Sequence, residues 1–132
     1  MKAVVTVLCL CAIFFSAVQG YSKEKMEAFH KECVAETGVD EEMAFKAMDG
    51  VFADDPKFKS FLLCFGKKAG FHNDAGELLT DVVRAKLLEM FSDEAVVNEM
   101  MKCSVEKATP EETAFEACKC MYAFKDKFVE YF

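Results

Sequence analysis

Basic residues are too few and too scattered in this chain to form a surface that binds nucleic acid. The sequence contains 16 Lys and Arg against 23 Asp and Glu, a formal net charge of −7. Binding to phosphate backbones requires clustered Lys and Arg. The two densest stretches, Lys67-Lys68 and the Lys residues of 119–127, are interrupted or balanced by acidic residues. Nucleic acid is therefore excluded as a partner, and the acidic excess suits a soluble protein.

Motifs that carry catalysis are also missing. The sequence has no Gly-x-Ser-x-Gly, no His-Glu-x-x-His and no glycine loop that cradles a phosphate. Its two histidines, His30 and His72, and the Cys-x-Cys at 118–120 lack the ligand spacing of a tetrahedral zinc site. The sequence therefore predicts a protein that is not an enzyme and that uses no metal and no cofactor. We expect His30 to be a partly buried helix residue.

Alternation of apolar and polar residues at every second position, the pattern of a strand, does not occur either. Apolar residues instead recur at helical spacing along nearly the whole chain, so the predicted fold class is all-α. Residues 69–77, "AGFHNDAGE", are the one stretch rich in Gly and Asn and are expected to form a loop. Six helices are expected to begin near Ser22, Asp40, Pro56, Thr80, Ser92 and Thr109, and the first and third are expected to end near Gly38 and Gly70.

The first twenty residues have the composition of a secretory signal peptide. "MKAVVTVLCLCAIFFSAVQG" combines Lys2, an uncharged apolar run and the small residues Val18 and Gly20 before Tyr21. An uncleaved anchor is the alternative, but the run is short for a membrane span and no other stretch of the chain is long and apolar enough. We expect residues 1–20 to be removed and residues 21–132 to form one extracellular domain that is not inserted in a membrane.

Removal of residues 1–20 leaves an odd number of cysteines: Cys33, Cys64, Cys103, Cys118 and Cys120. In an oxidising compartment, five cysteines close at most two bridges within one chain. On a helix, side chains two residues apart diverge by about 200°, so Cys118 and Cys120 do not pair easily with each other. Spacing alone does not choose among the remaining pairings.

Two segments resemble the insect odorant-binding proteins, the pheromone-binding and general odorant-binding family. "KSFLLCFGKKAGF" (59–71) is similar to the segment around the second and third of that family's six cysteines, and "TPEETAFEACKCMY" (109–122) to the segment around the fifth and sixth. Ser60 and Glu111 stand where the second and fifth cysteines would be, whereas Cys64 and Cys120 match the third and sixth. The two missing cysteines are partners in that family, so the chain resembles the subgroup that lacks this one bridge.

The resemblance covers roughly residues 22–124 and implies a compact, disulfide-stapled domain of six helices around an apolar cavity. It implies that Cys33 pairs with Cys64 and that Cys103 pairs with Cys120. Cys118 then lies outside both bridges. It is interpreted either as a redox-sensitive or intermolecular thiol or, as we favour, as a small buried side chain that lines the cavity.

Phenylalanine and methionine are abundant, with 12 Phe and 7 Met in residues 21–132 and no Trp in the chain. Rigid aromatic walls and adaptable thioethers suit a pocket for small apolar molecules, although an ordinary helical core has a similar composition. The residues expected to line the cavity, chosen from helical faces, are Phe52, Phe61, Phe65, Leu87, Val96, Met100, Ala114, Phe115, Cys118, Met121 and Tyr122.

The resemblance implies a secreted carrier that binds a small hydrophobic molecule, such as an odorant or pheromone, and transports it in extracellular fluid. A membrane receptor is a second partner that it suggests. The alternative is a secreted, non-sensory interaction or structural protein of gland secretion or hemolymph. His72 is expected either to titrate near neutrality or to be a solvated loop residue. The apolar tail with Phe128, Tyr131 and Phe132 is expected either to cover the cavity or to continue the last helix.

Overall fold

The computed structural model describes residues 23–129, and the predicted all-α class is confirmed within this range. The expected signal peptide, Tyr131, Phe132 and the side chain of Phe128 lie outside the described residues. The α-helices are α3 (Lys23–Thr37), α4 (Glu41–Lys46), α5 (Pro56–Ala69), α6 (Thr80–Met90), α7 (Glu94–Met101), α8 (Pro110–Met121) and α9 (Lys125–Val129). Two 3-10 helices, η1 (Ala47–Asp49) and η2 (Tyr122–Phe124), continue α4 and join α8 to α9.

Six helical segments result, because α8, η2 and α9 follow one another without a break in the sequence. The described residues contain no strand, only one isolated antiparallel bridge between His72 and Leu78. None of the helices in this range combines the length and the apolar character needed to cross a membrane.

Most helix ends follow the predicted capping residues. The Asp40 carboxylate accepts a hydrogen bond from the Glu42 N–H at 2.9 Å, and the Thr109 hydroxyl accepts one from the Glu112 N–H at 3.1 Å. Gly70 ends α5 in the left-handed conformation, with φ of 90°. These ends are therefore set by the local sequence.

Two residues expected to cap helices, Thr80 and Ser92, do not do so. Asp93, not Ser92, caps α7, because its carboxylate accepts a hydrogen bond from the Ala95 N–H at 2.9 Å. Leu79, not Thr80, precedes α6 and offers no side-chain cap. The Leu79 N–H donates instead to the Phe71 carbonyl at 2.8 Å, so a contact within the preceding loop fixes where α6 begins.

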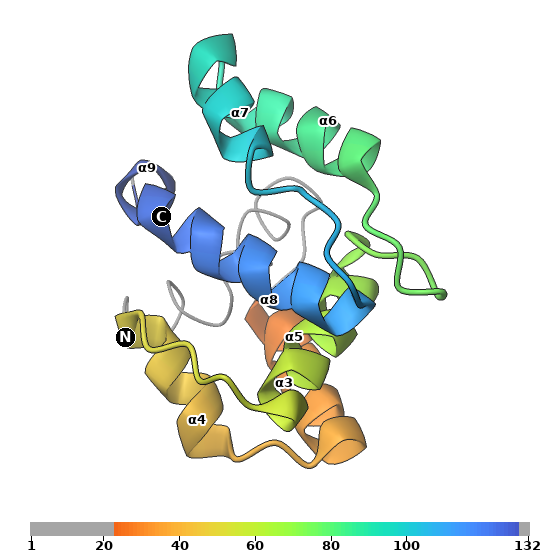
Figure 1. Cartoon of the computed structure of the whole chain (residues 1–132). Helices are drawn as coiled ribbons and strands as arrows, with labels where there is room; N and C mark the ends of the chain where they lie inside the picture. The colour runs from red at the N-terminus through yellow and green to blue at the C-terminus, as the bar shows by residue number, and fades with distance from the viewer. Residues whose placement is uncertain (1–22, 130–132) are drawn as a thin grey trace.

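Helix α5 lies at the centre of the packing. Its contacts with α8 and with α3 are the most extensive between helices, and α6 and α7 form a separate pair on the other side of α8 (Figure 1). The largest fully buried side chains include three Phe residues at helical spacing along α5, Phe58, Phe61 and Phe65. The apolar face of α5 therefore forms the middle of the core.

Two disulfides tie neighbouring helices to this arrangement. Cys33 on α3 is bonded to Cys64 on α5, and Cys103 after α7 is bonded to Cys120 on α8. These are the pairs that the family resemblance implied. In the loop-entropy model, closing loops with sequence separations of 31 and 17 residues stabilises the fold by about 3 to 4 kcal/mol each.

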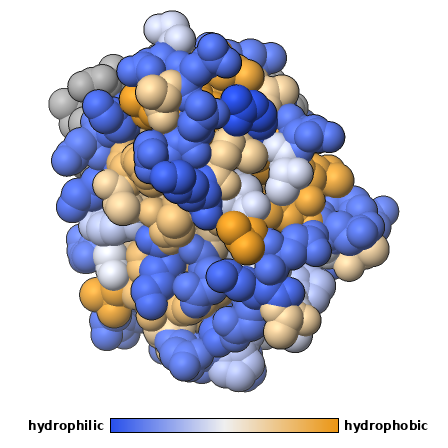
Figure 2. All heavy atoms as spheres, turned by 45° about the horizontal axis from the view of Figure 1, so that its top comes forward, coloured by the Kyte–Doolittle hydropathy of each residue, from blue (hydrophilic) through white to orange (hydrophobic). Residues whose placement is uncertain are grey.

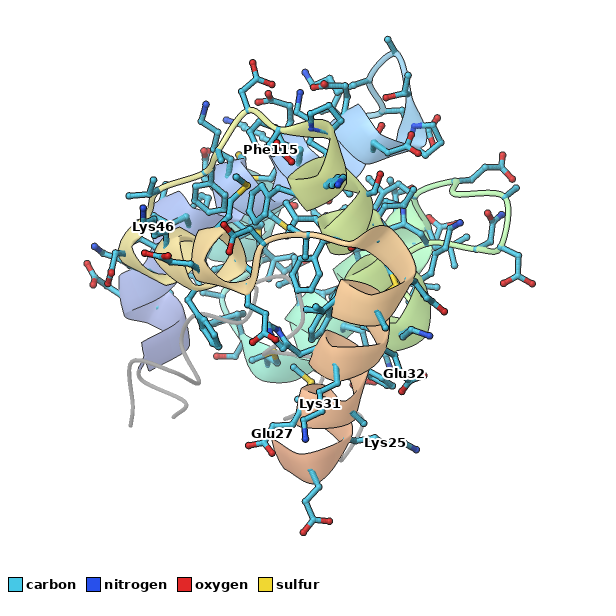
Figure 3. The ribbon with its side chains drawn as sticks, turned by 90° about the horizontal axis from the view of Figure 1, so that it is seen from below. Lys25, Glu27, Lys31, Glu32, Lys46 and Phe115 are labelled. Carbon is cyan, nitrogen blue, oxygen red and sulfur yellow. A yellow bond between two sulfur atoms is a disulfide. The ribbon has the colours of Figure 1, made fainter. Side chains whose placement is uncertain are left out.

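Charged side chains cover the outside of the domain. Figure 2 shows a mostly hydrophilic face with scattered apolar side chains. Figure 3 shows charged side chains of α3, among them Glu27 and Lys31, directed away from the domain, whereas Phe115 lies among the helices. This division matches the acidic excess of the sequence and leaves most large apolar side chains in the interior.

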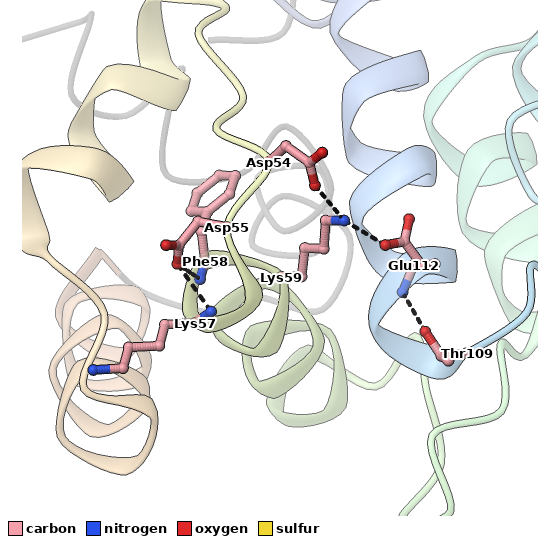
Figure 4. Close-up of polar contacts among 7 residues, drawn as sticks. All are labelled: Asp54, Asp55, Lys57, Phe58, Lys59, Thr109 and Glu112. Carbon is pink, nitrogen blue, oxygen red and sulfur yellow. Dashed lines mark hydrogen bonds and ion pairs between the residues drawn. The ribbon is translucent and has the colours of Figure 1, made fainter.

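Lys59 on α5 joins two other segments through ion pairs (Figure 4). Its ammonium pairs with Asp54 at 2.6 Å and with Glu112 on α8, and it lies 4.9 Å from the centre of the Phe115 ring. Hydrogen bonds, first to Asp54 and then to Glu112, raise the pKa of Lys59 to about 12. The hydrogen bond and charge of Lys59 hold the pKa of Asp54 below its usual range.

The change Lys59→Met should lower the stability of the protein at pH 7, because it leaves both carboxylates without their cation. Because folding raises the pKa of Lys59, its ion pairs stabilise the folded protein fully at any pH below the ordinary pKa of lysine. Because folding lowers the pKa of Asp54, the stabilisation from its carboxylate is lost as the pH falls through that lowered pKa. Urea unfolding should thus show a difference from wild type that shrinks in acid. The exposed Lys57→Met on the same helix should show no such difference, and equal effects of the two changes would contradict the prediction.

Ser60 and Glu111, the two positions that the resemblance aligns with missing cysteines, face one surface hollow. Both line it, together with Cys64 and Lys67, between α5 and the start of α8. The Lys59–Glu112 ion pair joins the residues next to them along each chain segment. The two positions therefore lie on facing sides of one helix contact.

The double change Ser60→Cys and Glu111→Cys should form a third disulfide and raise the free energy of unfolding by about 2 to 4 kcal/mol. Mass spectrometry under oxidising conditions tests the bond, and thermal unfolding with and without reductant tests the gain. The pair Ser60→Cys and Glu116→Cys is the control, since Glu116 does not line the hollow. Two free thiols at positions 60 and 111 would count against the assignment of these positions.

Candidate ligand-binding site

An apolar pocket lies between α5, α8 and the loop that precedes α6. Its walls come from five segments of the chain. The lining residues are Leu62, Gly66, Phe71, His72, Leu78, Val83, Ser104, Ala114, Ala117, Cys118 and Met121. The cavity volume is about 40 Å³, far below the roughly 300–1,000 Å³ of typical small-molecule sites. A ligand of that class therefore has to displace lining side chains.

The pocket wall is apolar apart from two side chains, His72 and Ser104, and the weakly polar sulfur of Cys118. Met121 and Leu78 supply flexible apolar surface, and the alanines of α8 supply small side chains. Sites for apolar ligands have this composition, in which one or two polar groups fix the orientation.

Backbone hydrogen bonds to Gly66 on α5 and within residues 70–79 hold His72 against α5. The N–H groups of Phe71 and His72 both donate to the Gly66 carbonyl, at 2.9 and 3.3 Å. The Asn73 N–H donates to the Glu77 carbonyl at 3.0 Å, which closes the tip of the loop. Gly76 has a φ of +88°, and a Cβ there would lie 2.7 Å from Pro110. The loop is therefore fixed by its own backbone and by close packing on α8.

His72 is buried, with 6% of its surface exposed, so the expectation of a solvated loop residue is wrong. Its Nδ1 lies 3.1 Å from the Gly76 carbonyl oxygen. Burial lowers the pKa of His72 below its usual value, and the hydrogen bond to Gly76 opposes this shift. The imidazole is accordingly neutral at physiological pH.

Three of the eleven candidates from the sequence, Ala114, Cys118 and Met121, line this pocket. The other eight do not. Phe61, Phe65, Leu87, Met100 and Phe115 are buried in the core, and Phe52, Val96 and Tyr122 are half-buried against it. Contact of these eight with a ligand stays a prediction.

Sequence reasoning missed eight residues that line the pocket, mostly for two reasons. Leu62 and Val83 lie on apolar helix faces, where a core residue and a pocket residue follow the same period. The loop residues Phe71, His72 and Leu78 follow no helical period, so no sequence pattern places them at a wall. The remaining three are Gly66, Ser104 and Ala117. Small side chains give no apolar signal, although they leave the space that a pocket requires.

One group of potential metal ligands lies at the surface of α3 and α5. The sulfurs of Cys33 and Cys64 and a carboxylate oxygen of Glu36 all lie within 4.8 Å of one another. The two sulfurs are bonded to each other, so this group offers no thiolate to a metal ion.

Comparison with known proteins identifies the kind of domain that holds this pocket. Residues 16–123 match the model of the PBP/GOBP family. The chain belongs to this family. Its membership confirms the resemblance and agrees with an all-α domain that is stapled by disulfides.

Similar proteins cover nearly the whole PBP/GOBP domain. The B1 protein of Tenebrio molitor is 36% identical over 88% of this chain and 92% of its own length. The B2 protein of the same beetle is 35% identical over 88% of this chain and 94% of its own. Among solved structures, the fatty acid binding protein OBP56a from the oral disk of the blowfly Phormia regina is 32% identical, with a TM-score of 0.57, over 80% of this chain and 96% of that one.

Membership in the PBP/GOBP family establishes the general activity. The family consists of proteins that bind small hydrophobic ligands and carry out no catalysis. The apolar pocket between α5 and α8 is the described cavity that suits such ligands.

A second histidine, His30 on α3, is buried outside the pocket. It has 7% of its surface exposed, which corrects the expectation of a partly buried residue. Its ring stacks on Phe45 at 5.4 Å and meets the edge of Phe61 at 5.4 Å. Neither ring nitrogen has a hydrogen bond within the described residues, and the nearest carboxylate oxygen, of Glu41, is 4.0 Å away. Burial lowers the pKa of His30, and the charge of Glu41 opposes this.

The change His30→Phe should keep or raise stability at pH 7, by up to about 1 kcal/mol, because it removes a buried polar group without partners. A histidine whose pKa is lowered by folding stabilises the fold above its ordinary pKa and loses this contribution as pH falls. Wild type should thus lose more stability than His30→Phe between pH 7 and pH 5. Urea unfolding at both pH values measures this, and parallel losses would contradict it.

Proposed function

We propose that this protein is a secreted carrier that binds a small hydrophobic molecule and transports it through extracellular fluid. The observation that supports it most is the apolar pocket between α5 and α8 in a PBP/GOBP domain. An odorant, a pheromone or another lipid-like compound matches the apolar lining of this pocket and would bind by displacing some of its side chains. The blowfly relative, which is named as a fatty acid binding protein, supports a ligand with a long apolar chain.

Removal of apolar ligand surface from water drives binding, at about 25 cal/mol per Å². The free energy gained must exceed the cost of enlarging a pocket of about 40 Å³. Met121, Leu62 and Leu78 have several rotatable bonds between them and are the lining residues best able to move. The carrier needs no covalent chemistry.

Secretion agrees with two features of the chain. Residues 1–20 have the composition of a signal peptide, and residues 21–132 form the domain that remains after its removal. Two disulfides within the described residues require an oxidising compartment to persist. A membrane receptor that accepts the ligand or the loaded carrier is the second partner.

A non-sensory role is the second candidate function. The observation that favours it is the source of the blowfly relative, which comes from the oral disk. A secreted protein that acts through its surface would share the fold and the charged exterior. Finding the transcript outside sensory tissue, with no lipid extractable from purified protein, would favour this candidate.

The carrier proposal predicts saturable binding of an apolar fluorescent dye such as N-phenyl-1-naphthylamine, displaced by a long-chain competitor. The change Ala117→Phe should weaken dye binding at least tenfold, because the added ring fills the pocket that Ala117 lines. Fluorescence titration measures both. The exposed Ala123→Phe, one helical segment further on, is the matched control and should bind like wild type. Absence of saturable, displaceable binding would reject the carrier function.

A further inference from the structure

Two polar side chains, His72 and Ser104, line the otherwise apolar pocket. Resting on the carrier function proposed above, we propose that Nε2 of His72 accepts a hydrogen bond from the ligand, so that the preferred class is an apolar chain ending in a hydroxyl group. Esters, ethers, aldehydes and carboxylates of the same length are then poorer ligands.

The partner of Nδ1 fixes the hydrogen-bonding role of Nε2. A backbone carbonyl oxygen can only accept, and the Gly76 oxygen lies 3.1 Å from Nδ1. Nδ1 therefore carries the hydrogen atom. In the neutral ring, Nε2 is then unprotonated and presents a lone pair. It can accept a hydrogen bond and cannot donate one.

Packing on Gly66 shows where this lone pair lies. A Cβ built on Gly66 would come within 2.6 Å of Cδ2 and 3.3 Å of Nε2 of His72, so this edge of the ring faces α5 at Gly66. Gly66 and His72 both line the pocket. Within residues 23–129, no hydrogen bond to Nε2 is present. Because this edge of the ring and Gly66 border the same pocket, we infer that a ligand in the pocket can approach Nε2.

Chemistry decides which ligand satisfies this acceptor. An alcohol donates its O–H to Nε2, and the hydroxyl of Ser104 on the same pocket wall can donate to the alcohol oxygen. An ether, ester or aldehyde has acceptors only and leaves Nε2 without a partner. A carboxylate would need a protonated imidazole. Burial disfavours that form, as does Lys67, and only Glu106 and the Gly76 hydrogen bond favour it.

Displacement of N-phenyl-1-naphthylamine from the full domain at pH 7 tests the proposal with three ligands of equal chain length: dodecan-1-ol, its methyl ether and dodecanoate. Wild type should prefer the alcohol to the ether by about tenfold, since a buried acceptor left without a donor costs that much. His72→Phe should reduce this ratio to about one while the ether affinity changes little. His30→Phe, which removes a buried histidine away from the pocket, should keep the wild-type ratio.

Equal affinities for alcohol and ether in wild type, or a preference that survives in His72→Phe, would overturn the assignment. A preference for dodecanoate would overturn it in favour of acid recognition. The carrier function stands in these cases, because the dye and the ether still bind. If the dye itself does not bind, both proposals fail.

Nitrogen resonances of the two histidines give a test that does not depend on the folding of a His72 variant. In wild type labelled with ¹⁵N-histidine, dodecan-1-ol should shift the Nε2 resonance of His72, and the methyl ether should not. His30→Phe assigns the signals, because the chain has two histidines. An Nε2 resonance that stays unchanged at saturating alcohol would overturn the proposal.

Discussion

Packing of α5 between α3 and α8 is the contact on which the rest of this structure depends. The Phe side chains of α5 occupy the middle of the core, and its cysteine is bonded to α3. The same helix supplies Gly66, where the missing side chain lets the His72 ring approach the backbone. One apolar stripe with one glycine thus sets both the stability of the domain and a wall of its pocket.

An ionic link lies where the family's third disulfide would connect α5 to α8. Lys59 pairs with Glu112, one residue along from Ser60 and Glu111 on each helix. An ion pair at a partly exposed position contributes less than a disulfide and leaves the two helices freer to separate. Disulfides join α3 to α5 and the segment after α7 to α8, whereas α5 and α8 are held to each other by side-chain contacts. The described residues show no disulfide between α5 and α8.

Local signals predicted the helices well, and long-range contacts explain what they missed. Asp40, Pro56 and Thr109 act through neighbours within a few residues, so their effects are readable from the sequence. Val51 is apolar and follows η1 directly, but Gly50 turns the chain and leaves Val51 53% exposed. The pocket depends on how loop 70–79 folds back on α5, through backbone hydrogen bonds that no side-chain pattern reveals. Helical periodicity therefore identified the α8 wall and not the loop wall.

The small volume of the pocket follows from the same helix contact. Leu62 and Gly66 on α5 face Ala114 and Ala117 on α8, so enlarging the cavity means loosening this contact or moving the loop between them. The loop is held by its own hydrogen bonds, whereas the α5–α8 contact has an ion pair and apolar side chains. A ligand whose apolar surface replaces these contacts offsets the free energy that is lost when α5 and α8 separate. Ligand binding and domain stability are thus coupled through α5, and the ligand raises the free energy of unfolding by RT ln(1 + [L]/Kd).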